Sequence, residues 1–160
     1  MKNLCYILFL SALTLVSCKK SNPVAADNSS MTVTIDGATY NLTGGGIGGT
    51  INGLPVITLS GTDGRNMYVF FDLDNVTTTG TYNIGIDSGG IAHHTVDMDF
   101  HPDSTKEYSS LTGPNPTGKF IITELTASSI SATFSATLTR QKGTGDSTVT
   151  FTNGSLSIRY

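Results

Sequence analysis

The stretch Ser129–Thr139, which reads SISATFSATLT, alternates apolar and hydroxyl-bearing side chains without a break. One side of the extended chain carries only apolar residues, namely Ile130, Ala132, Phe134, Ala136 and Leu138. A period of two residues is that of a β-strand with one buried side and one solvent-facing side. This stretch therefore predicts a half-buried strand, and the same pattern recurs along most of the chain.

The neighbouring segments extend this strand into a sheet. Residues 119–125 predict a strand before it, and a polar loop at 140–146 leads to a further apolar alternation that includes Phe151. Asn153-Gly154 is typical of a type I′ hairpin turn, which would place Phe151 opposite Leu156. We therefore expect a C-terminal meander of three consecutive antiparallel strands.

The N-terminal part of the domain shows the same alternation of apolar and polar side chains. Residues 31–35 alternate up to Asp36-Gly37, a dipeptide typical of a type I′ turn, and a two-residue turn sets Val33 opposite Tyr40. The glycine-rich segment 43–52 predicts a bulged or loosely paired edge. Further strands are expected at 55–60, 67–73, 80–84, 91–100 and 107–111. With no helical periodicity, residues 31–160 predict one all-β domain, an antiparallel sandwich or open barrel of about nine to ten strands.

Composition narrows the classes of function. The chain has twelve Asp and Glu against nine Lys and Arg and carries no basic block, so we do not expect a nucleic-acid partner. Its two cysteines, Cys5 and Cys18, precede the domain, which leaves no thiol for a disulfide, a metal or catalysis. The chain also lacks a Gly-x-Ser-x-Gly elbow and any cofactor motif. We therefore expect a non-enzymatic protein without a cofactor.

The first eighteen residues resemble a bacterial lipoprotein signal. Lys2 precedes an apolar run at 6–16, and residues 15–18, Leu-Val-Ser-Cys, resemble a lipobox. The resemblance implies a signal at 1–18 that is cleaved before Cys18, which then carries acyl chains such as palmitate and anchors the protein to a membrane. Lys19 replaces the aspartate linked with inner-membrane retention, so the resemblance implies the outer membrane. An ordinary secretory signal with a chance cysteine is the alternative, and residues 19–30 predict a flexible tether.

A family resemblance covers most of the domain. The segments 130–137 and 149–158, the Val-x-Ile-Asp-Gly-x-x-Tyr motif of 33–40 and the Gly-Thr-Tyr start at 80–82 resemble small Bacteroidota lipoproteins that carry a domain of unknown function. Ala132 stands where that pattern has glycine, and Leu156 where it has phenylalanine. The resemblance implies an all-β protein of the cell envelope and no particular activity.

One strand carries candidate metal ligands. These weak candidates share one side of residues 91–101: His93, Asp97, Asp99 and His101. Neighbours on one side of a strand lie about 6.5–7 Å apart, so one strand supplies at most two ligands to a zinc ion. Glu107, Asp72 or Asp74 would have to complete the set. The alternative is a solvated polar side whose charges block edge pairing.

Aromatic and hydroxyl side chains supply the remaining candidates. The chain has no Trp, so a sugar-binding platform would use Tyr68, Tyr82 or Tyr108, each of which could instead belong to the core or its rim. Ser104 and Ser147 lie in Asp-Ser-Thr triplets that resemble the O-glycosylation acceptor of Bacteroidota.

These observations predict a lipid-anchored envelope protein that acts as a non-enzymatic binding or structural module. A glycan- or small-ligand-binding lipoprotein is the first alternative, and a metal-dependent hydrolase is the second. The possible partners are accordingly the membrane, a glycan and an envelope protein.

Overall fold

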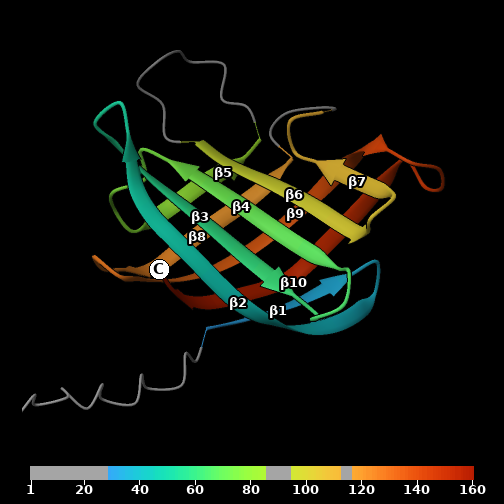
Figure 1. Ribbon diagram of the computed structural model, residues 1–160, viewed down its shortest axis with the longest axis horizontal. Coiled ribbons are helices and arrows are strands. Elements are labelled where there is room, and N and C mark those ends of the chain that lie inside the picture. The colour runs from blue at the N-terminus through green and yellow to red at the C-terminus, as the bar shows by residue number, and fades with distance from the viewer. Residues whose placement is uncertain (1–28, 86–94, 113–116) are drawn as a thin grey trace, which may run out of the picture.

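The computed structural model describes residues 29–85, 95–112 and 117–160, and all regular structure within them is β-strand (Figure 1). The strands are β1 (Ser30–Ile35), β2 (Ala38–Ile51), β3 (Leu54–Thr62), β4 (Tyr68–Asp74), β5 (Gly80–Ile84), β6 (Thr95–Asp103), β7 (Lys106–Ser109), β8 (Gly118–Leu125), β9 (Ser129–Lys142) and β10 (Thr148–Arg159). β1 begins one residue before the predicted domain boundary. No helix in these three ranges is long and apolar enough to cross a membrane.

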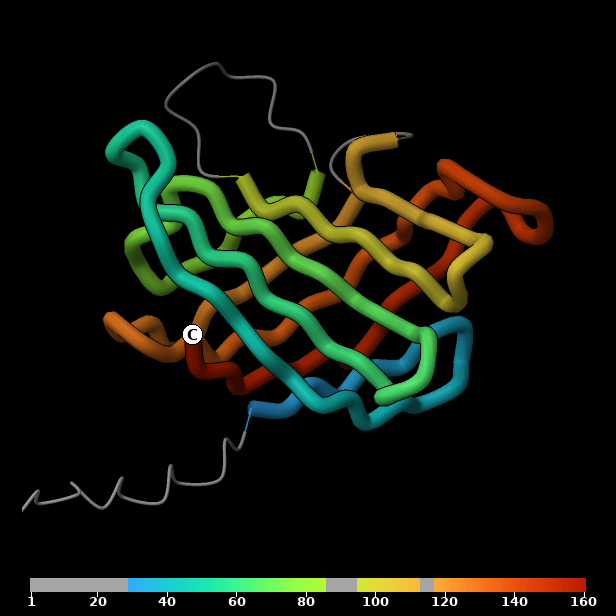
Figure 2. Tube along the Cα trace, in the orientation of Figure 1, coloured from blue at the N-terminus to red at the C-terminus, as the bar shows by residue number. Residues whose placement is uncertain are grey.

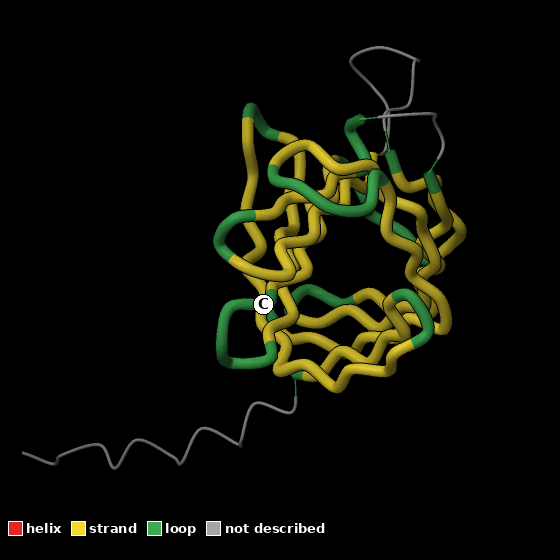
Figure 3. The backbone as a smooth tube through the Cα atoms, turned by 90° about the vertical axis from the view of Figure 1, so that its right-hand side faces the viewer, coloured by secondary structure: helices red, strands yellow, loops and turns green. Residues whose placement is uncertain are grey.

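The ten strands form one sheet that curls back on itself. Its order is β10-β1-β2-β3-β4-β6-β5-β8-β9-β7, and β10 also pairs with β9 (Figure 2). The pairs are antiparallel, apart from a short parallel contact of β5 with β6 at Ile84 and Val96. Viewed at right angles, the strands surround a single interior (Figure 3). The all-β prediction is confirmed. β8, β9 and β10 form an antiparallel meander of three strands, but it differs from the predicted one at its last hairpin.

The first predicted hairpin is present with the expected register. Asp36 and Gly37 have positive φ angles of 47° and 87°, as a type I′ turn requires. Val33 lies opposite Tyr40, and Met31 lies opposite Leu42. Because register decides which side chains face inward, this turn places Met31, Val33 and Leu42 in the core.

The second predicted hairpin, at Asn153-Gly154, is wrong. β10 continues through these residues, and a β-bulge there shifts its register against β9. Asn153 takes the left-handed conformation at φ 51°, while Gly154 leaves room for the Phe134 ring, which a Cβ at that position would meet at 2.5 Å. A continuous strand is favoured because β10 then pairs with β9 on one side and with β1 on the other.

The glycine-rich segment is neither bulged nor loosely paired, although it does lie at an edge of the β2–β3 ladder beyond the end of its pairing with β1. Residues 43–51 pair with β3 along their whole length, up to a hairpin at Asn52-Gly53 with φ angles of 52° and 82°. The C-terminal end of β10 packs on this part of β2, and a Cβ on Gly48 would meet the Tyr160 ring at 2.6 Å. These glycines mark a close approach between two strands.

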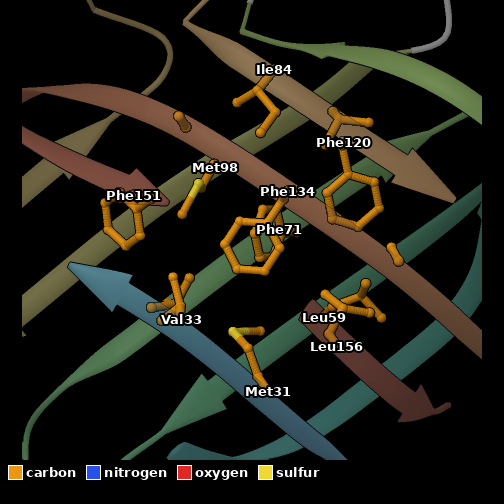
Figure 4. Packing of buried hydrophobic residues seen from close by; sticks show 14 of the residues in the cluster. Met31, Val33, Leu59, Phe71, Ile84, Met98, Phe120, Phe134, Phe151 and Leu156 are labelled. Atoms are coloured by element: carbon orange, nitrogen blue, oxygen red, sulfur yellow. The ribbon is translucent and has the colours of Figure 1, made fainter. Parts of the chain in front are cut away.

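The core lies between the two sides of the curled sheet. Phe71 of β4 meets Phe120 and Phe134 from the opposite side, with ring centroids 5.0 and 4.8 Å apart (Figure 4). All three rings are almost completely buried. Contacts of this kind join β4 to β8 and β9, and so hold the outer surface of β4 in a fixed position.

Candidate ligand-binding site

The outer side of β4 and β6 carries four of the predicted site residues, namely Tyr68, Asp97, Asp99 and His101. Both strands alternate, so apolar side chains point into the core and their neighbours point outward. Antiparallel pairing sets Tyr68 opposite His101, and Phe70 opposite Asp99. The structure therefore brings together residues that lie far apart in the sequence.

An aromatic cleft lies at one end of this surface. The rings of Tyr68 and Phe70 stack with centroids 5.8 Å apart, and His101 meets Phe70 edge-on at 5.9 Å. Tyr68 is 39% exposed, which is high for a large aromatic side chain. The cleft measures about 260 Å³ and is lined by Asn66, Tyr68, Phe70, His101, Asp103 and Ser104.

Two aspartate-capped turns form the polar rim of the cleft. Asp103 Oδ1 accepts hydrogen bonds from the hydroxyl and backbone N–H of Thr105, at 2.6 and 2.7 Å, and these bonds lower the pKa of Asp103. On the facing turn, Asp63 Oδ1 accepts from the backbone N–H groups of Arg65 and Met67, and the bond from Arg65 contributes most to lowering the pKa of Asp63. The capped turns fix the backbone positions of Ser104 and Asn66.

An acidic patch continues from the cleft along the same strands. It comprises Asp72, Asp74, Asp97 and Asp99. Asp97 lies directly opposite Asp72, and its half-buried carboxyl has one oxygen, Oδ1, with no hydrogen-bond partner among the described residues. Burial, followed by repulsion from Asp74, Asp99 and Asp72, raises the pKa of Asp97 to about 6.

The predicted metal ligands are not assembled in the part of the chain that the structure describes. Asp97, Asp99 and His101 share the outer side of β6, as predicted. Within residues 29–85, 95–112 and 117–160, however, no three His, Cys, Asp or Glu side chains are placed to hold a metal ion. His93 lies outside the described residues, so a ligand set that includes it stays a prediction.

The other two candidate tyrosines are engaged in the fold. Tyr108 is only 6% exposed, and its hydroxyl donates to the carbonyl of Asp146 at 3.3 Å, so its interpretation as an accessible platform is wrong. It is buried because β7 is held between β6 and β9. Tyr82 packs against the core and donates to the carbonyl of Thr78 at 2.7 Å.

The predicted modification sites fall in different parts of the chain. Ser104 and Ser147 are both exposed, Ser104 on the rim of the cleft and Ser147 just before β10. Cys18 lies outside the described residues. The structure thus makes both serines accessible without testing whether either is glycosylated.

Comparison with known proteins adds no further guide to function. No protein-family model, curated protein or solved structure matches this chain. The geometry of the described residues and the N-terminal sequence are therefore what indicates a function for this chain.

Sequence reasoning missed Phe70, Asn66 and Asp103 as parts of the cleft. The alternation of residues 67–73 places Phe70 on the same side of the strand as Tyr68, so this aromatic pair could have been predicted from the sequence. The pairing of β4 with β6 could not be predicted from the sequence, because β5 intervenes in the chain and lies on the far side of β6, where it pairs with β8. The cleft is therefore a product of topology.

A second, larger cleft of about 490 Å³ lies at the other end of the strands. It is lined mainly by apolar or glycine residues of β2, β3 and the turns after β4 and β8, together with Tyr160. Tyr160 donates its hydroxyl to the carbonyl of Thr126 at 2.8 Å, and burial raises the pKa of this phenol. The engaged hydroxyl makes this cleft a weaker candidate for specific polar recognition than the aromatic one.

Proposed function

We propose that this protein is a non-enzymatic, lipid-anchored binding module of the cell envelope, and that the aromatic cleft on β4 and β6 takes a neutral sugar. The observation that carries the proposal is the stacked pair of exposed Tyr68 and partly buried Phe70, with His101 at its edge. A sugar ring presents C–H groups on its faces and hydroxyls around its rim. An aromatic floor with a polar border complements both features.

The size and charge of the cleft limit the class of sugar that it could bind. Its volume of about 260 Å³ lies just below the range of roughly 300–1,000 Å³ that is usual for small-molecule sites, which favours one sugar unit or a chain end. The Asp103 carboxylate borders the cleft, and Asp99 lies beside Phe70 on the neighbouring strand. Fixed negative charges repel uronic acids and sulfated or phosphorylated sugars, so the proposed ligand is uncharged.

The lipid anchor rests on the lipobox-like sequence that ends at Cys18. Acyl chains at this residue place the domain in the envelope, and the outer membrane is the proposed location. Labelling with radioactive or clickable palmitate should mark the native chain and fail to mark a Cys18→Ser variant. Equal labelling of both chains would refute the anchor without bearing on the sugar site.

The sugar site is tested with a panel of neutral and acidic oligosaccharides and the purified protein. A stacked aromatic pair contributes about 0.5–1.5 kcal/mol, so Tyr68→Ala should weaken binding of a neutral sugar about two- to twelvefold. Tyr68→Phe keeps the ring and should retain most of the affinity. Ile121→Ala removes a similarly exposed side chain on β8 and serves as the matched control.

Two results would overturn the sugar proposal. The first is that no neutral sugar on the panel binds to the native protein. The second is that a sugar binds with the same affinity to the native protein and to Tyr68→Ala, which would place its site elsewhere.

A further inference from the structure

An exposed apolar patch covers the outer side of the β2–β3 hairpin. Ile47 is 76% exposed, Ile51 is 62% exposed and Leu54 is 42% exposed. Ile47 and Ile51 share one side of β2, and Leu54 pairs directly with Ile51 across the Asn52-Gly53 turn. We call these three residues the hairpin patch.

The hairpin patch is not a misplaced part of the core. The opposite side of the same strands is filled, since Gly46 and Gly48 lie against Tyr160 and Ile57 is buried. Large aliphatic side chains that remain exposed after the core is complete leave apolar area in water, at a cost of about 25 cal/mol per Å². Exposed apolar groups gathered at one place indicate a surface that is covered by a partner.

The strands that carry the hairpin patch also lack charged residues. Residues 37–62 contain no Asp, Glu, Lys or Arg, although 13% of the whole chain is charged. The uncharged stretch spans β2 and β3 and is bounded by Asp36 and Asp63. The hairpin therefore has no ionic group whose hydration would be lost on entering an apolar medium, and no carboxylate to be repelled by anionic headgroups.

The position at which the chain enters the domain bears on what covers the hairpin patch. Ser29 accepts a hydrogen bond from the N–H of Gly44 through its carbonyl, and one from the N–H of Arg159 through its hydroxyl, both at 3.0 Å. From Ser30 onward β1 runs antiparallel to β2 and away from the hairpin tip. The chain thus enters the domain at Gly44, on the strand that carries Ile47 and Ile51.

Covalent reach connects this entry point to the membrane. Eleven peptide links separate Cys18 from Ser29, and a chain of that length spans at most about 40 Å. The tip at Ile51 extends seven residues beyond Gly44, or about 23 Å along the strand. The tip of the hairpin can therefore reach the membrane to which the acyl chains on Cys18 would anchor the protein.

We propose that the hairpin patch inserts into the surface of the bilayer that holds the Cys18 acyl chains; this inference rests on the lipid anchor proposed above. Ile47, Ile51 and Leu54 supply an apolar contact in addition to the acyl chains. β3 runs from this tip to the turn beside the aromatic cleft, about 26 Å away by its rise (Figure 1). Insertion at the tip holds the cleft away from the membrane, where a ligand can reach it.

The absence of Trp from the chain allows a direct test. The full-length lipidated protein is reconstituted into phosphatidylethanolamine–phosphatidylglycerol vesicles whose acyl chains carry bromine, with a single Trp introduced as Ile51→Trp. Because an inserted hairpin buries its apolar side chains about 5–10 Å deep, this Trp should shift to shorter wavelength and lose about half of its emission or more. Ile121→Trp, at a site 41% exposed on β8, is the matched control and should be little quenched.

The outcomes separate this inference from the anchor itself. Ile47→Trp serves as a second reporter of insertion. If the protein is palmitate-labelled and vesicle-bound, but Ile51→Trp and Ile47→Trp are quenched no more than Ile121→Trp, the insertion is overturned and the anchor stands. A blue shift that depends on protein concentration without vesicles assigns the patch to a second copy of the chain and also overturns it. Loss of vesicle binding together with loss of palmitate label refutes the anchor, and the insertion with it.

Discussion

Replacing Asp97 with asparagine should stabilise the protein at neutral pH. The Asp97 carboxyl faces Asp72 across the strand pair and has neighbours of like charge at Asp74 and Asp99, with one buried oxygen that lacks a partner among the described residues. Burial and this repulsion raise the pKa of Asp97 from an ordinary 3.8 to about 6. The ionised group therefore opposes folding, and asparagine removes the charge with little change in shape.

The magnitude follows from the change in pKa. The difference between 3.8 and about 6 corresponds to about 3 kcal/mol at 1.36 kcal/mol per pKa unit. Because the side chain is only half-buried and solvent screens it, we halve this figure to roughly 1–1.5 kcal/mol. The native state binds more protons than the unfolded state between pH 3.8 and 6, so stability falls as pH rises through this window and levels off above it.

Urea denaturation followed by circular dichroism tests this reasoning. Asp97→Asn should unfold at higher urea than the native protein at pH 7.5, and this advantage should shrink below pH 6 and disappear near pH 4. Asp146→Asn removes an exposed carboxylate outside the acidic patch and should change stability by less than about 0.5 kcal/mol at either pH. An Asp97→Asn effect of the same size at pH 4 and pH 7.5, or a loss of stability at pH 7.5, would refute the argument.

The remaining predictions concern packing, and urea denaturation measures each of them. Gly48→Ala should cost about 1–3 kcal/mol, because its Cβ meets the Tyr160 ring, while Gly49→Ala, with nothing within 4 Å, should cost far less. Phe71→Ala should cost about 3–5 kcal/mol, since the ring is fully buried against two others. Asn153→Val should cost about 1–2 kcal/mol, because valine disfavours the left-handed conformation of the bulge; equal stability would contradict the assigned bulge.

Alternation predicted the inward and outward sides of the strands because it depends only on the period of the chain. Val96, Met98 and Phe100 are buried as expected, and Asp97 and Asp99 face outward. Alternation says nothing about which strand lies beside which. The pairing of Tyr68 with His101 required β4 and β6 to become neighbours while β5 joined β8, a choice set by the packing of the whole sheet.

Burial of Tyr108 was unpredictable for a related reason. β7 has only four residues, and taken alone it is a short piece at the end of a turn-rich region. In the fold it bridges β6 and β9, so that Phe100 lies against the Tyr108 ring, with centroids 6.0 Å apart. A strand enclosed on both edges loses the exposure that its composition suggests.

The two Asn-Gly pairs show how tertiary context decides between identical local signals. At 52–53 the pair forms a hairpin turn, and at 153–154 it forms a bulge inside a continuous strand, although both asparagines adopt a left-handed φ near 50°. The two sites share only the asparagine conformation, because Gly53 has a positive φ of 82° and completes a type I′ turn whereas Gly154 does not. The dipeptide thus favours a left-handed asparagine and leaves the direction of the chain open. At 153 that direction is decided by the ladders that β9 and β1 offer on both edges, whereas β2 beyond residue 43 pairs with β3 only, which follows the turn. The same difference leaves the β2–β3 tip projecting as an uncharged, apolar arm.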